Sequence, residues 1–178
     1  MDTLLPDLVT GRLSLVIIPA GTTRMLLELV ARLAQRRPLR VLDGGNCFNA
    51  YIVARELGRY TRDVEAALER IQVARAFTCY QVLTLLEDTP ADGVPTLMLQ
   101  MLDTFHDENV SLAERERLLA SSIQELRRLS QRSSVGISTR WPRAAMPDAM
   151  KLLGILEDAA DHVWRMETEQ QPVALRLF

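Results

Sequence analysis

The stretch VIIPAGTTRMLLELVARLAQ (residues 16–35) predicts an apolar strand, a Pro-Ala-Gly-Thr turn and an amphipathic helix. A turn between a strand and a helix is where nucleotide-binding proteins place their phosphate loop. Such a loop has the form G-x-x-x-x-G-K-[ST], in which glycines let backbone N–H groups surround the phosphates, the lysine reaches the terminal phosphates and the hydroxyl holds Mg²⁺. This turn is therefore the first candidate site in the chain.

Compared with that pattern, the turn keeps the spacing, Gly21 and one positive charge. Thr23 replaces the second glycine, Arg24 replaces the lysine, and Met25 stands where the hydroxyl should be. A thioether cannot ligate a hard cation such as Mg²⁺. Two interpretations stay open. The turn is a degenerate nucleotide-binding site made of Gly21, Thr22, Thr23 and Arg24, or it is an ordinary turn in which Thr22 or Thr23 caps the helix.

The composition limits the classes of protein that the chain can belong to. With 178 residues, 48% hydrophobic and 25% charged, it is long enough for one buried core, and we expect one domain over residues 1–178. A net charge of −2 gives no overall basic field for nucleic acid. Two cysteines without a C-x-x-C spacing and only two histidines predict no metal site and a reducing cytoplasm. No apolar run reaches the roughly 18 residues that span a membrane, so we expect a soluble cytoplasmic protein without membrane contact.

Apolar runs alternate with amphipathic stretches along the chain, which is typical of strands buried on both faces and their crossover helices. We therefore expect an α/β fold with a predominantly parallel sheet and helices on both faces. The expected strands are residues 13–18, 39–43, 96–103, 134–139 and 173–178, with a shorter one at 71–76. The expected helices are residues 23–36, 49–58, 62–70, 78–88, 111–132 and 147–160.

Ligands of doubly wound sheets bind beyond the carboxyl ends of the strands, so two further strand ends are candidate sites. Asp43 ends a strand and precedes Gly44 and Gly45, which leaves it as the one carboxylate there that could orient an attacking water. It could equally cap the helix that begins near Asn49. Asp103 ends the apolar run 96–103, which is the Walker B arrangement, in which the carboxylate holds Mg²⁺ through water.

The last candidate loop, SVGISTRWPRAAMP (residues 134–147), combines cations with an aromatic ring. Arg140 and Arg143 flank Trp141, a mixture that can bind a nucleic-acid backbone and stack on a base. We predict weak DNA contacts at these three residues. The alternative is that Trp141 anchors the loop to the core.

Taken in order, these segments resemble the ATPase core of the RecA/RadA recombinase superfamily, especially its short RadB-like paralogs. The most specific stretch is ALERIQVARAFTCYQVLTLLED (residues 67–88), which is similar to the family's segment after the second core strand. IPAGTTRM resembles the family's GppGtGKT, and RVLDGGNCF its iDtEgtF. Residues 102–139 are similar to the Walker B strand and the helix and strand that follow. Residues 155–178 look like the closing segment, where Asp161 precedes a hydrophobic strand. The resemblance implies a RecA-like P-loop NTPase fold.

This sequence departs from the family pattern at the residues that carry out the family's chemistry. Gly45 matches the catalytic glutamate, Arg24 the lysine and Met25 the magnesium-binding hydroxyl. Loss of one such group can cost on the order of a thousandfold in rate. We therefore expect no catalytic residue, no ATP hydrolysis and no cofactor beyond weakly bound ATP. The loops after Asp103 and Thr139 are also short beside the DNA-binding loops of true recombinases.

These departures favour a non-catalytic recombinase paralog, an accessory protein in DNA repair by homologous recombination that acts through protein partners. We expect a homodimer or a hetero-complex with another repair protein, and weak or indirect DNA binding. Candidate interface segments are TLMLQML (96–102) and PRAAMPDAMKLLGIL (142–156), although such Met-containing segments more often form core. Two alternatives stay open: an ATP-hydrolysing ATPase in which Arg24 substitutes for lysine, and a RecA-fold scaffold or regulator unrelated to DNA.

Overall fold

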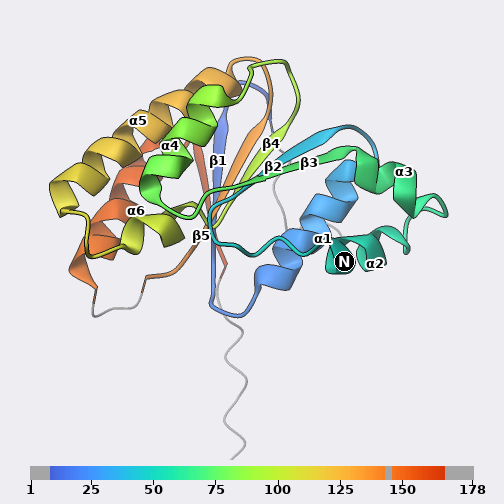
Figure 1. The fold of residues 1–178 in the computed structure, drawn as a ribbon, viewed down its shortest axis with the longest axis horizontal. Helices are drawn as coiled ribbons and strands as arrows, with labels where there is room; N and C mark the ends of the chain where they lie inside the picture. Colours follow the sequence, from blue (N-terminus) through green and yellow to red (C-terminus); the bar gives the residue numbers. More distant parts are fainter. Residues whose placement is uncertain (1–8, 143–145, 167–178) are drawn as a thin grey trace, which may run out of the picture.

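The computed structural model describes residues 9–142 and 146–166 and has an α/β fold with one six-stranded sheet, all of whose strands are parallel (Figure 1). The strands are β1 (Leu13–Ile18), β2 (Leu39–Asp43), β3 (Ile71–Arg75), β4 (Thr96–Leu99), β5 (Val135–Arg140) and β6 (His162–Arg165), in the order β3-β2-β4-β5-β1-β6. The helices are α1 (Thr23–Ala34), α2 (Ala50–Leu57), α3 (Val64–Glu69), α4 (Cys79–Asp88), α5 (Leu112–Ser130) and α6 (Pro147–Ala159), with a 3₁₀ helix, η1 (Met101–His106). The predicted parallel α/β fold is confirmed, and it is consistent with a RecA-like core.

Helices cover both faces of the sheet (Figure 1). The helices α1, α2 and α3 pack on one face around a core that includes Val30, Val41 and Leu57. The helices α4, α5 and α6 pack on the other face around a core that includes Leu42 and Leu118. Connections that lead toward β3 lie on the first face, and those that lead toward β6 lie on the second. All five crossovers therefore have the same handedness, as parallel sheets require.

Local sequence signals set where several helices begin. Ser111 caps α5 by accepting a hydrogen bond from the N–H of Glu114 at 3.3 Å, as its spacing predicted. Asn49 caps α2 in the same way, with the N–H of Ile52 as donor at 3.1 Å. These caps fix the points at which the chain leaves the loops at the carboxyl ends of the strands.

One strand prediction differs from the structure, and another is not tested by it. The predicted strand 96–103 ends at Leu99, because Gln100 has a left-handed backbone with φ of 50° and the chain then enters η1. Met101 stays fully buried in that turn, so the apolar run continues where the strand does not. The predicted strand 173–178 lies outside the described residues. The strand β6 directly follows Asp161, the position at which the family resemblance implied one.

Candidate functional site

The predicted candidate residues meet at one edge of the sheet. Gly21 follows β1, Asp43 ends β2, Asp103 follows β4, and Thr139 and Arg140 end β5. The strands are neighbours in the order β2-β4-β5-β1, so their loops form one continuous row. The chain leaves β1 and β5 in opposite directions, and it does the same at β2 and β4. Such reversals mark the ligand-binding crevice of open parallel sheets.

The turn after β1 is closed by hydrogen bonds of its own. Gly21 has φ of 84°, a left-handed conformation that favours glycine. The hydroxyl of Thr22 donates to the carbonyl oxygen of Pro19 at 2.7 Å, and the N–H of Met25 donates to the carbonyl oxygen of Thr22 at 3.0 Å. Thr22 occupies the N-cap position of α1 without a side-chain capping bond, and Thr23 is the first residue of the helix. Thr22 therefore holds the predicted N-cap position, but its hydroxyl does not make the capping hydrogen bond.

Arg24 is used to join two helices. Its Nε lies 3.2 Å from Oε1 of Glu28, and its Nη2 lies 3.1 Å from Oε1 of Glu56. Glu56 is 1% exposed, near the end of α2. The positive charge at the position of the family's lysine is therefore shared between two carboxylates of this chain.

Asp43 is fully buried and holds its own loop. Its two carboxylate oxygens accept hydrogen bonds from the N–H groups of Cys47 at 3.0 Å and Phe48 at 2.9 Å. The Nε of Arg75 lies 3.3 Å from Oδ2 of Asp43 and balances its charge. Asp43 does not cap α2, since Asn49 does so. Burial and the Asp43 carboxylate raise the pKa of the Cys47 thiol to about 12, so this thiol is neutral at physiological pH.

Gly45 has no room for a side chain. A Cβ at this position would lie 2.3 Å from Cβ of Gln100 and 2.9 Å from Oδ2 of Asp103. Gln100 is itself 1% exposed, and both polar atoms of its amide lack a partner among the described residues. The position that matches the family's catalytic glutamate is therefore filled by the chain that follows β4.

The two charges nearest the end of β5 neutralise each other. Asp103 lies on η1 and forms an ion pair with Arg140. The backbone N–H of Trp141 donates to the carbonyl oxygen of Ile18 at 3.1 Å, which attaches this loop to β1, while the side chain is 41% exposed. Arg143 lies outside the described residues. The predicted DNA contact by these residues stays a prediction.

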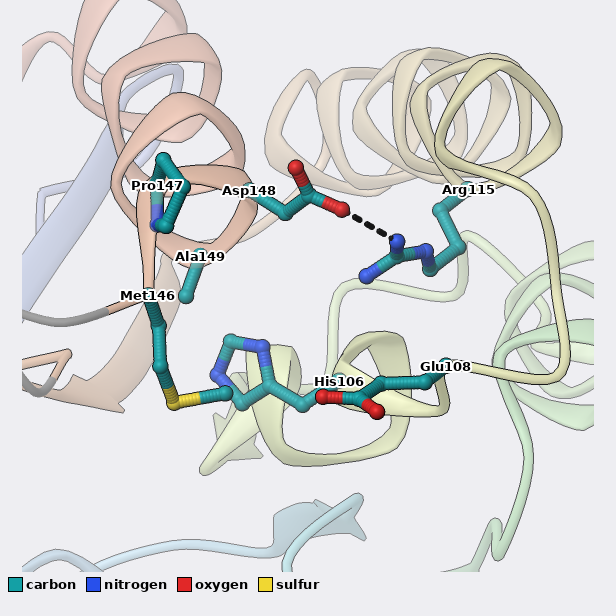
Figure 2. Close-up of a pocket in the computed structure, with 7 residues that line it drawn as sticks. All are labelled: His106, Glu108, Arg115, Met146, Pro147, Asp148 and Ala149. Atoms are coloured by element: carbon teal, nitrogen blue, oxygen red, sulfur yellow. Dashed lines mark hydrogen bonds and ion pairs between the residues drawn. The ribbon is translucent and has the colours of Figure 1, made fainter.

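A cavity of about 250 Å³ lies between η1 and the first turns of α5 and α6 (Figure 2). Figure 2 shows its lining residues, His106, Glu108, Arg115, Met146, Pro147, Asp148 and Ala149. Arg115 is 5% exposed, and it donates to the carboxylate of Asp148 at 2.7 Å and to the carbonyl oxygen of Phe105 at 3.2 Å. Burial lowers the pKa of His106.

Sequence reasoning missed this cavity, although one signal was present. Arg115 lies three residues after Leu112 and four before Leu119, both on the apolar stripe of α5. A charged residue on such a stripe needs a buried partner, and Asp148 supplies it. The ion pair joins α5 to α6. The guanidinium group of Arg115, the main charge of the cavity, is therefore already paired and holds the two helices together.

Neither a metal-binding group among the described residues nor a match to a known protein indicates what the site does. Among the described residues, no group of three or more His, Cys, Asp or Glu side chains could hold a metal ion. None of the helices in residues 9–142 and 146–166 is long and apolar enough to cross a membrane. A scan against protein-family models gave no match, and a search of curated proteins gave no significant one. Function is therefore inferred from the geometry of the site and from the RecA/RadA resemblance.

Proposed function

We propose that this chain is a non-catalytic RecA-like protein that assists DNA repair by homologous recombination through a protein partner. The observation that carries the non-catalytic part is that the candidate site is closed by contacts within the chain. Arg24 pairs with Glu56, and Asp103 pairs with Arg140. Gly45 has no space for a catalytic carboxylate. The charged groups that phosphoryl transfer would need are therefore already paired with other side chains of this chain.

The link to recombination rests on the family resemblance, whose most specific stretch is residues 67–88. That stretch includes β3, an edge strand of the sheet, and all of α4. Two of its aromatic side chains are open to solvent, since Phe77 is 65% and Tyr80 is 48% exposed. Exposed aromatic residues are enriched at protein interfaces. We place the partner contact at these two side chains.

The two interface segments expected from sequence are poorer candidates for the partner contact than Phe77 and Tyr80. Residues 96–102 are buried throughout in β4 and the start of η1, so the expectation that they form an interface is wrong. In the second segment, Met150 is 46% exposed, but Leu152 and Leu153 are buried. The described part of that segment is therefore divided between the core and the surface.

The partner can be tested with the RecA- or RadA-type recombinase encoded in the same genome. Calorimetric titration should detect binding without nucleotide, and Phe77→Ala or Tyr80→Ala should weaken it tenfold or more, about 1.4 kcal/mol. Tyr60→Ala is the matched control, because Tyr60 is an aromatic of similar exposure, 46%, beyond the end of α2. Absence of binding with and without ATP, or an equal loss in the control, would overturn the proposed contact.

The non-catalytic part has its own test. The purified chain should hydrolyse ATP with Mg²⁺ no faster than a blank. Hydrolysis above the blank that disappears in Arg24→Ala would instead favour the ATPase alternative. The fold should tolerate this substitution, because Arg55 and Arg59 still pair with Glu56.

A further inference from the structure

The two segments that build the helical layers carry opposite net charge. Residues 23–70, which include α1, α2 and α3, contain nine arginines and six acidic residues, a net charge of +3. Residues 79–166, which include α4, α5 and α6, contain nine basic and thirteen acidic residues, a net charge of −4. The small net charge of the whole chain therefore conceals a basic segment and an acidic segment, which we call the basic layer and the acidic layer and whose helices lie on opposite faces of the sheet (Figure 1). The positive surplus of the basic layer lies on its turns, since α1, α2 and α3 themselves hold three arginines and four glutamates.

The basic layer has a cluster of arginines at its centre. Three guanidinium groups surround the buried carboxylate of Glu56: nitrogen–oxygen distances are 3.1 Å for Arg24, 3.5 Å for Arg55 and 2.6 Å for Arg59. Their side chains are 53%, 48% and 58% exposed. Glu28, the other carboxylate of the cluster, pairs with no residue but Arg24 in the part of the chain that the structure describes. The cluster thus keeps a surplus of positive charge that faces solvent.

The positive charge continues along α1. Arg32 follows Glu28 by four residues, so it lies along the same side of α1 as Arg24, and Arg36 lies in the turn two residues beyond the end of the helix. Both are exposed, and neither has an ion-pair partner among the described residues. A helix of twelve residues is about 18 Å long. That length matches roughly five phosphates along one nucleic-acid strand.

The chemistry of the cluster suits phosphate. The basic residues of this layer are all arginines, and a guanidinium group can hold two phosphate oxygens at once. Arg55 and Arg59 each use one terminal nitrogen on Glu56, which leaves further N–H donors for a ligand. Because Glu56 already holds the three side chains together, little conformational entropy remains to be lost on binding.

We propose that the α1–α2 surface binds the phosphate backbone of a nucleic acid, with Arg24, Arg55 and Arg59 as the central contacts and Arg32 and Arg36 extending them. Recognition is independent of base sequence, since the contacts are to phosphate. The acidic layer faces away from the nucleic acid because like charges repel, and this fixes the orientation of the protein on the nucleic acid. This inference stands on the charges of the fold and does not depend on the proposed function.

The test is fluorescence anisotropy with a labelled 20-base-pair duplex of random sequence. The five arginines less the two carboxylates Glu28 and Glu56 leave a charge of +3, and three neutralised phosphates predict a slope near −2.7 in log K against log salt, so affinity should fall about 40-fold between 50 and 200 mM NaCl. Arg55→Gln and Arg59→Gln should each weaken binding several-fold and reduce the slope by about one. Arg117→Gln is the matched control: Arg117 is 59% exposed but lies in the acidic layer, on α5, and its loss should change nothing.

Arg32→Gln separates a loss of binding from a loss of folding. It should leave the fold intact, because Arg32 forms no ion pair within the described residues. It should also weaken binding. Equal affinity of wild type and all the basic-layer variants would overturn the proposal, as would an equal loss in Arg117→Gln. Tight binding of polyglutamate without binding of duplex would assign the surface to an acidic protein instead. The recombinase titration at Phe77 and Tyr80 reports a different surface, so the two proposals fail separately.

Discussion

Gly45→Ala is expected to destabilise the fold by about 2–3 kcal/mol, the upper part of the range for overpacking in a core. The added Cβ would lie 2.3 Å from Cβ of Gln100 and 2.9 Å from both Cγ of Gln100 and Oδ2 of Asp103. A Cβ is bonded to the backbone, so the side chain of Gln100 cannot rotate away and the chain itself must shift. In a domain of this size the melting temperature should fall by roughly 4–12 °C.

Urea denaturation with a fitted m-value would measure this cost, and two further variants would locate it. Gly154→Ala adds the same methyl group in the middle of α6, where nothing lies within 4 Å, and should stabilise the chain by about 0.5–1 kcal/mol. Gln100→Gly in the Gly45→Ala background removes the colliding carbons and suits the φ of 50° at that position. The double variant should therefore recover at least about 1 kcal/mol as coupling energy.

Two results would contradict this expectation: a Gly45→Ala chain as stable as the wild type, or a Gly45→Glu chain that folds normally and gains ATP hydrolysis. Either result would mean that the loop after β2 can move away from Gln100 and that the edge is open to a catalytic carboxylate.

Three further predictions concern buried and paired groups. Burial lowers the pKa of His106 below its usual 6.5, so the stability it contributes is complete above pH 6.5 and is lost as the pH falls; urea midpoints at pH 7.5 and 5.5 should differ less in His106→Gln. With the other cysteine replaced by alanine, Cys47 should react with a thiol reagent far more slowly in the native chain than in urea, because its pKa is about 12. Asp161→Ala removes the acceptor of the Leu13 N–H at 2.7 Å and should lower the free energy of unfolding by roughly 1–2 kcal/mol in the same denaturation assay.

The order and type of most elements could be predicted because buried parallel strands are continuous apolar runs. The end of β4 could not, since Met101 is as buried in η1 as it would be in a strand. The apolar pattern reports burial and is silent about the left-handed backbone of Gln100 that ends the strand. Burial was likewise no guide to β6, a short edge strand in which Trp164 is 47% exposed.

The meeting of Gly21, Asp43 and Asp103 at one edge could be predicted, because the carboxyl ends of parallel strands share an edge. The partners of the charged side chains could not be predicted. Glu56 is 32 residues from Arg24, and only the crossing of α1 and α2 brings them together. The sequence indicates that Gly45 lacks a carboxylate, but the structure is needed to see that Gln100 occupies the space.

The position of β1 in the sheet has a consequence for synthesis on the ribosome. Its partners are β5 and β6, and roughly 120 residues separate it from the first of them. At about 5–20 residues per second, β1 waits on the order of ten seconds before it can pair. During that time LSLVII (residues 13–18) is a nascent apolar segment with both of its edges open, a typical substrate for a chaperone and a typical nucleus for aggregation. Slower translation of residues 19–134 should therefore lower the yield of folded protein more than slower translation after Arg165.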